Sequence, residues 1–162
     1  MTSHPQTRPE TITCLADYLP RQRIHPYART ETTDELLRTL THGLHAEGTI
    51  SDPDTFTQTL HTRLAHGPTG FHGIALLAAR SRTITTPAAA FARIPRNLTW
   101  PSADDHTIHD VFLLAVLHRL IDTGCIQTYA VLARHTAHPG FRRMLSASRT
   151  TDELYELFRL IR

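Results

Sequence analysis

The stretch that decides the fold runs from residue 67 to residue 80 and reads Gly-Pro-Thr-Gly-Phe-His-Gly-Ile-Ala-Leu-Leu-Ala-Ala-Arg. It begins with residues that favour turns, among them the pair Thr69-Gly70. It then becomes short and apolar between Gly73 and Leu77, as expected of a buried strand. We therefore predict a turn or loop that leads directly into a strand.

Two helices are predicted on the N-terminal side of this stretch. Thr32 to Glu35 form a capping box, in which Thr32 is the N-cap and Glu35 reaches back to it. The helix that follows carries leucines on one face and ends near Gly48. Ser51-Asp52-Pro53 begins the second helix, with the proline in the first turn, where its missing N–H is not needed. A short strand is also expected around Ile24.

The C-terminal side predicts strands first and helices afterwards. Strands are expected over Ala88–Ile94 and over Ile108–Leu117, although the second run would also suit a buried helix. Helices are expected over Ile126–His135, over a short segment around Met144, and after a second capping box that begins at Thr150. This order of helices, strands and helices predicts an α/β fold with a mixed sheet.

The length and composition indicate one globular domain. Residues 1–10 are polar with two prolines and are predicted to be a disordered tail, which leaves residues 11–162 as the single domain. The chain is 40% hydrophobic and has a net charge of only +2. That charge is too small to indicate nucleic-acid binding.

The sequence also predicts the cellular compartment. Cys14 and Cys125 are far apart and fit no zinc or redox spacing, so we expect two thiols in a reducing environment. No apolar run is long enough to span a membrane, and the N-terminus lacks the apolar segment of a signal peptide. We therefore expect a cytoplasmic protein without membrane insertion and without a cofactor.

The central stretch resembles the active loop of the enzyme IIA domains of the bacterial sugar phosphotransferase system, in the fructose/mannitol class. In that family a Thr-Gly turn leads to Asn-Gly and then to Gly-Ile-Ala-Ile-Pro-His, whose histidine carries a phosphoryl group. Thr69, Gly70, the run Gly73–Ala75 and the basic Arg80 fit this pattern. The similarity extends from about Ile12 to Ile161, and the last helix favours the nitrogen-regulatory branch. It implies a mixed β-sheet flanked by helices on both faces.

The departures from the family pattern concern its chemistry. Ala78 stands where the family has its phosphorylated histidine, and Gln127 stands where it often has a second histidine. His72 replaces the asparagine, and the turn is one residue shorter. A methyl group has no lone pair with which to accept a phosphoryl group. The resemblance therefore implies a vestigial pocket without a catalytic residue, formed by His72, Gly73, Ala78, Arg80 and Gln127.

The resemblance implies a function for such a protein. In the regulatory branch the unphosphorylated protein acts by docking on targets, so a chain that is locked in that form is expected to be a regulatory protein-binding module rather than an enzyme. The partner implied is a protein such as a kinase, a transporter or a component of the phosphotransferase system. The sequence does not predict the oligomeric state.

Two alternatives remain open at this stage. The first is an active phosphocarrier that uses a displaced histidine, His72. The second is a metal-binding protein, because residues three apart on a helix share a face and can chelate a metal. Three His-x-x-His spacings occur, with Asp105, Asp110 or Cys125 as candidates for a third or fourth ligand; the pairs are His42/His45, His106/His109 and His135/His138. Asp104-Asp105 are interpreted as turn residues rather than as paired catalytic carboxylates.

Overall fold

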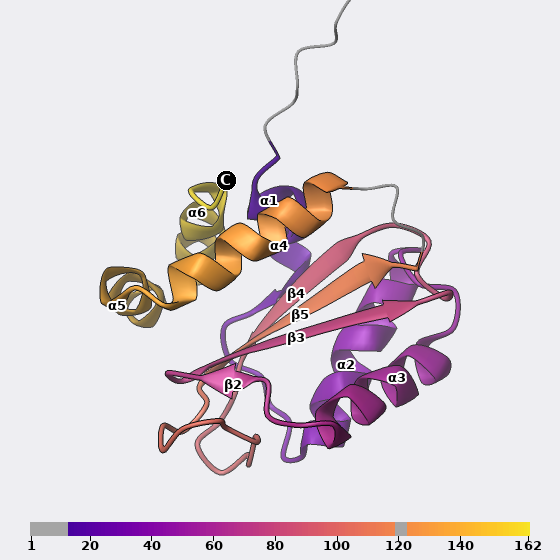
Figure 1. The fold of residues 1–162 in the computed structure, drawn as a ribbon, viewed down its shortest axis with the longest axis horizontal. Coiled ribbons are helices and arrows are strands. Elements are labelled where there is room, and N and C mark those ends of the chain that lie inside the picture. The colour runs from indigo at the N-terminus through magenta and orange to yellow at the C-terminus, as the bar shows by residue number, and fades with distance from the viewer. Residues whose placement is uncertain (1–12, 119–122) are drawn as a thin grey trace, which may run out of the picture.

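The structure of the chain is a computed structural model that describes residues 13–118 and 123–162. The predicted tail, residues 1–10, lies outside the described residues. A five-stranded sheet separates two layers of helices (Figure 1). In chain order the elements are α1 (Leu15–Tyr18), a 3₁₀ turn (Arg21–Arg23), β1 (Ile24–His25), α2 (Thr33–Ala46), α3 (Pro53–Ala65), β2 (Gly70–Phe71), β3 (Ile74–Ser81), β4 (Ala88–Arg93), β5 (Asp110–Leu117), α4 (Thr123–Thr136), α5 (Pro139–Ala147) and α6 (Thr151–Arg159).

The sheet has the strand order β1-β4-β5-β3-β2. β1 runs parallel to β4, and β3 runs parallel to β5, whereas the β4–β5 and β2–β3 pairs are antiparallel. The predicted mixed sheet is thus confirmed, and the run that ends at Leu117 is a strand, not a buried helix. Sequence reasoning missed β2, because a two-residue strand is too short for any periodicity to appear.

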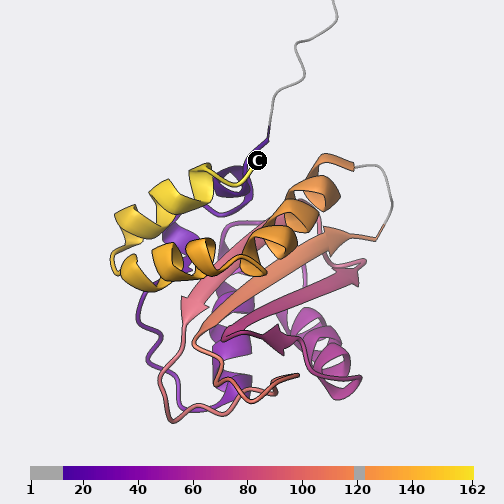
Figure 2. The ribbon, with the colours of Figure 1, turned by 60° about the vertical axis from the view of Figure 1, so that its left-hand side comes forward.

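Both faces of the sheet are covered, as predicted (Figure 2). Along β3, Ala75, Leu77 and Ala79 pack into the cluster under α2 and α3. The alternate residues Ile74 and Leu76 belong to the cluster under α1, α4, α5 and α6. Successive side chains of a strand point to opposite faces, so a central strand that is buried on both sides is apolar almost throughout. This alternation directs Ala78 and Arg80 toward α4.

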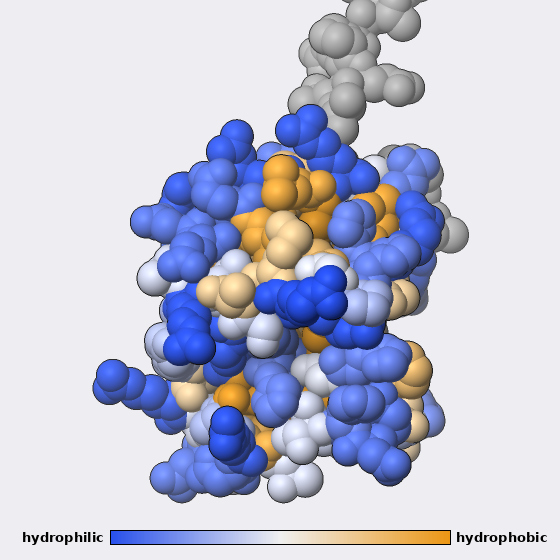
Figure 3. Space-filling model, turned by 90° about the vertical axis from the view of Figure 1, so that its left-hand side faces the viewer, coloured by the Kyte–Doolittle hydropathy of each residue, from blue (hydrophilic) through white to orange (hydrophobic). Residues whose placement is uncertain are grey.

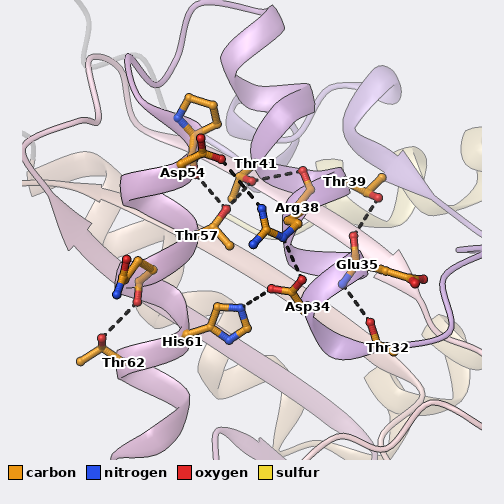
Figure 4. Close-up of polar contacts among 12 residues, drawn as sticks. Thr32, Asp34, Glu35, Arg38, Thr39, Thr41, Asp54, Thr57, His61 and Thr62 are labelled. Atoms are coloured by element: carbon orange, nitrogen blue, oxygen red, sulfur yellow. Dashed lines mark hydrogen bonds and ion pairs between the residues drawn. The ribbon is translucent and has the colours of Figure 1, made fainter.

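The helix pair α2–α3 begins where the sequence predicted. Thr32 Oγ1 accepts a hydrogen bond from the backbone N–H of Glu35 at 3.1 Å, as an N-cap does. The second bond of the predicted capping box is shifted by one residue. The carboxylate of Glu35 accepts a hydrogen bond from the backbone N–H of Glu31 at 3.0 Å, and not from that of Thr32. Asp34 joins the two helices, because it accepts from Arg38 at 2.8 Å and lies 2.7 Å from His61 Nε2 (Figure 4).

The guanidinium of Arg93 ties the sheet to α5. Arg93, the last residue of β4, donates to Asp110 Oδ1 at 2.8 Å, and Asp110 begins β5. The same guanidinium donates to the carbonyl oxygens of Ser148 and Leu145 at 2.6 and 2.8 Å. It therefore caps the C-terminal end of α5 while it neutralises a buried carboxylate.

The outer surface of α5 and α6 is mostly hydrophilic, with a limited apolar area (Figure 3). Met144 of α5 and Leu160, which follows α6, are exposed large apolar side chains of this layer. No described helix is both long enough and apolar enough to cross a membrane.

Candidate functional site

The predicted site residues lie at opposite ends of β3. Ala78 and Arg80 lie in the second half of the strand, whereas His72 and Gly73 form the turn that joins β2 to β3. Ala78 lies four positions after Ile74, which is about 13 Å at about 3.3 Å per residue. Because β3 is extended, His72 and Gly73 lie at one end of the strand and apart from Ala78 and Arg80, while Gln127 lies on α4.

Ala78 lines a small open pocket between β3, β5 and α4. Its volume is about 270 Å³, and its described lining consists of Ala78, Ala79, Arg80, Val116, Ile126 and Tyr129. Ala78 is exposed and is paired in register with Leu114 of β5. No described residue that lines this pocket carries an imidazole.

The two polar side chains of this pocket have different roles. The Tyr129 hydroxyl lies 3.1 Å from the carbonyl oxygen of Ala88 and 3.3 Å from that of Ala115, so it donates inward to the sheet. Burial raises the pKa of Tyr129, which keeps its hydroxyl protonated. Arg80 is exposed and makes a long hydrogen bond of 3.4 Å to the carbonyl oxygen of Leu117. The pocket therefore offers a cation, but its hydroxyl is not a competent nucleophile at neutral pH.

Two further polar residues lie near this end of the sheet. Gln127 is exposed on the first turns of α4, and its neighbour Ile126 lines the pocket in its place. His118 follows β5 directly, at the end of the sheet where Arg80 pairs with Val116. Sequence reasoning did not consider His118, because no motif contains it. Only its position after a strand that lies parallel to β3 could have indicated it.

At the other end of β3, His72 of the β2–β3 turn forms a cluster with Asp104 and His106 of the loop before β5. Asp104 Oδ2 accepts the backbone N–H of His72 at 2.9 Å, and Asp104 Oδ1 accepts from Ser102 Oγ and from the backbone N–H of His106 at 2.9 and 3.0 Å. These bonds, that from His72 first, hold the pKa of Asp104 well below its usual range. The interpretation of Asp104 as a turn residue is confirmed.

The predicted metal-ligand sets are not the ones that the fold brings together. Among residues 13–118 and 123–162, the group of His, Cys, Asp and Glu side chains close enough to share an ion is His72, Asp104 and His106. Asp110 is engaged by Arg93, so it is not available as a ligand. His106 therefore pairs with a residue 34 positions earlier and not with its predicted partner, because the loop before β5 folds against the β2–β3 turn.

A larger pocket of about 580 Å³ opens beside this cluster, between the sheet and α5. Its lining is basic, with Arg96, Arg142 and Arg149 in addition to the paired Arg93. His72 and His109 also line it, so the turn is surrounded by cationic or potentially cationic groups.

Comparisons with known proteins agree with this architecture. Residues 17–160 match the family described as phosphoenolpyruvate-dependent sugar phosphotransferase system, EIIA 2. A curated relative, the 2-O-alpha-mannosyl-D-glycerate-specific EIIABC component from Escherichia coli K12, is 29% identical over 129 residues. That alignment covers 78% of this chain and 20% of the relative, so the chain spans about a fifth of that protein.

Solved structures with the same fold have low sequence identity. The nitrogen regulatory protein IIA-Ntr from Neisseria meningitidis is 18% identical with a TM-score of 0.78, covering 88% of this chain and 97% of that one. IIA mannitol from Escherichia coli is 18% identical with a TM-score of 0.65, covering 85% and 96%. A third structure is the complex of the Escherichia coli mannitol enzyme IIA with phosphorylated enzyme IIB, at 18% identity and TM-score 0.67, covering 85% and 94%.

Proposed function

The chain belongs to the EIIA type-2 family of the phosphoenolpyruvate-dependent sugar phosphotransferase system, and within that family we propose that it is a degenerate phosphocarrier domain that acts by binding a protein partner. One observation carries the proposal. The pocket beside α4, where the family resemblance assigns the phosphorylated histidine, is lined by the methyl group of Ala78 and by no imidazole of a described residue.

The chemistry of that pocket supports the proposal further. Phosphoryl relay needs a neutral imidazole as nucleophile and donors placed around the transferred oxygens. Arg80 is the remaining group that could hold those oxygens. The Tyr129 hydroxyl, raised in pKa and bonded to the sheet, cannot serve as the nucleophile. The pocket thus keeps a donor for the phosphoryl oxygens and lacks an acceptor for the phosphorus.

The geometry disfavours the alternative in which His72 is a displaced phosphoacceptor. His72 lines the pockets at the other end of β3 and does not line the pocket beside α4. A partner that delivers phosphate to the position of Ala78 would have to shift by about four strand residues, roughly 13 Å, to reach it.

The proposed partner is another component of the phosphotransferase system, a kinase or a transporter. The support for the first of these is a relative of the same fold, the mannitol enzyme IIA, which forms a complex with phosphorylated enzyme IIB. A domain that keeps the fold and lacks the nucleophile would hold such a partner without drawing phosphate from it. Binding would then be constitutive, or would compete with a phosphorylatable paralogue.

The experiment that tests the proposal is a phosphorylation assay by intact mass. The protein is incubated with phosphoenolpyruvate and the two general phosphotransferase proteins, with a phosphorylatable IIA domain as the positive control. We expect the control to gain one phosphoryl group and this chain to gain none. An acid-labile gain on this chain would overturn the proposal, and a His118→Ala variant would show whether the histidine after β5 is the acceptor.

Restoring the histidine gives a second test. The pocket of about 270 Å³ can hold an imidazole ring, so Ala78→His should fold. We nevertheless expect it to remain inactive in relay, because Gln127 and the shortened turn leave the ring without its support, and preorganised donors contribute roughly 3–4 kcal/mol to such steps. The matched variant is Ala78→His/Ile126→His, which places a second imidazole among the residues that line the pocket and should accept phosphate faster than the single variant. Efficient transfer by Ala78→His alone would contradict the idea of a decayed site.

A further inference from the structure

The cluster of His72, Asp104 and His106 joins two segments that are separate in sequence. His72 belongs to the β2–β3 turn, and the other two residues belong to the loop that leads to β5. His106 Nδ1 lies 3.2 Å from Asp104 Oδ2, and His72 Nδ1 lies 3.9 Å from the same oxygen. The ligand atoms of all three residues lie within 4.8 Å of one another.

These distances fit a tetrahedral zinc ion. Zinc binds imidazole nitrogen and carboxylate oxygen at about 2.0–2.1 Å, which places neighbouring tetrahedral ligands about 3.3 Å apart. One of the two measured separations is already near this value, and the other exceeds it by about 0.6 Å. The ligand nitrogens of the two imidazoles also lie within 4.8 Å of one another, and a rotation of the His72 side chain, which is not fully buried, would bring its Nδ1 nearer to Asp104.

The carboxylate at the centre of the cluster is held in place before any ion binds. Ser102 Oγ and two backbone N–H groups donate to it, as the supporting groups of a metal ligand commonly do. His72 adopts φ 55, a left-handed conformation that is unusual for a residue other than glycine. That conformation brings its N–H and its ring to the same side of the turn as Asp104.

The surroundings supply room and a further ligand. A pocket of about 500 Å³ is lined by His72, His106 and His109, together with Asp105 and Arg96. Water can take the fourth position, as in open zinc sites, because His109 lines the pocket but is outside the group of three ligands. In this pocket the opposite charges of Asp105 and Arg96 offset one another, whereas the neighbouring larger pocket adds Arg142 and Arg149. The attraction for a cation therefore comes from the Asp104 carboxylate itself, at the centre of the cluster.

We propose that this chain binds one divalent transition metal ion, with Zn²⁺ as the probe, through His72, Asp104 and His106. The site is independent of phosphotransfer, because it lies at the opposite end of β3 from Ala78. A bound ion would fasten the β2–β3 turn to the loop before β5. Because it binds the folded chain, it would stabilise the fold in proportion to the logarithm of the free metal concentration.

The test uses the whole chain, prepared without a polyhistidine tag and stripped with a chelator. Zn²⁺ is titrated by calorimetry, and metal content is measured after dialysis. His106→Ala is the main variant, because the side chain of this exposed residue contacts Asp104 and His72. His72→Ala is the second variant. The matched control is His42→Ala/His45→Ala, which removes an exposed pair of histidines on α2.

We expect one equivalent of zinc on the parent chain and on the control, and at least a tenfold weaker affinity in each of the two cluster variants. We also expect the melting temperature of the parent and of the control to rise with zinc. Circular dichroism establishes that each variant is folded. The proposal is overturned if the parent binds no stoichiometric zinc, if His106→Ala and His72→Ala bind as tightly as the parent, or if the control loses as much affinity as they do.

Discussion

Arg93→Met is expected to destabilise the protein more than any other single replacement of an arginine that we consider. The parent side chain makes an ion pair with Asp110 and donates to two carbonyl oxygens at the end of α5. Methionine keeps much of the volume of the arginine stem but removes every donor. The carboxylate of Asp110, a side chain that is 9% exposed, is then left without a cation.

The expected loss in the free energy of unfolding follows from the polar groups that Arg93→Met leaves without a partner. Breaking a buried ion pair by removing one partner costs about 3–5 kcal/mol, because an uncompensated charge stays buried. The carbonyl oxygen of Ser148 also loses a donor, at about 1 kcal/mol. Burial already raises the pKa of Asp110, so the carboxyl can take up a proton and limit the penalty. We therefore expect a loss of about 3–4 kcal/mol at pH 7, within the range for a broken buried pair.

The measurement is urea unfolding followed by circular dichroism and by the fluorescence of Trp100, the single tryptophan, which is buried. Arg96→Met is the matched control: Arg96 is exposed in the same pocket, and its replacement should change stability by about 0.5 kcal/mol or less. Arg93→Met/Asp110→Leu should recover at least half of the loss, since a packed apolar pair can replace a buried ion pair.

The pH dependence of stability tests the same explanation for the Arg93→Met variant. Without Arg93 the pKa of folded Asp110 rises further above its unfolded value, so the folded state binds more protons and gains stability as pH falls. The cost of Arg93→Met should thus shrink between pH 7 and pH 5. A loss below about 1 kcal/mol, or a double variant whose cost equals the sum of the two single costs, would refute the buried-pair reasoning.

Two other predictions concern stability. Burial lowers the pKa of His25 below the ordinary value of 6.5, so the unfolded chain binds the proton more readily than the folded chain. The free energy of unfolding should therefore fall as pH drops below about 6.5. His25→Gln should make that pH dependence weaker in unfolding curves, and an unchanged pH dependence would contradict this. Thr150→Ala should lower the free energy of unfolding by about 1 kcal/mol, because Thr150 Oγ1 accepts the backbone N–H of Glu153 at the start of α6. The control Thr151→Ala, one residue later, should lower it less. Equal unfolding midpoints for the two variants would argue against the cap.

Most of the fold could be predicted from the sequence, because the N-caps and the apolar faces of the helices leave clear local patterns. The caps at Thr32 and Thr150 were predicted from single side chains, and both accept the expected backbone N–H. The helices they begin carry leucines at helical spacing on their buried faces. β5 was ambiguous because a strand covered on both faces lacks alternation, and only its pairing with β3 and β4 decides the matter.

The site was predicted less well, because sequence distance is a poor guide to separation along a strand. Ala78 and Gln127 were taken from a family pattern, which gives no distance to His72; in the structure the extended β3 lies between His72 and Ala78. The contact of His72 with Asp104 joins residues 32 positions apart, which no local spacing reveals. The left-handed backbone at His72 was equally hidden, since that position commonly calls for glycine or asparagine.

On our proposal that the chain lacks the nucleophile of its family, the position of Ala78 also explains how the fold could persist without it. Ala78 is exposed, and its neighbours in the strand, Leu77 and Ala79, face the opposite core. A side chain at this position contributes little to burial, so exchanging an imidazole for a methyl there costs the sheet almost nothing. The backbone pairing with Leu114 is unaffected by the exchange. On our proposal, the strand and the surface around it are retained because the fold requires them. A histidine at position 78 is required only for phosphotransfer, so it can be lost without loss of the fold.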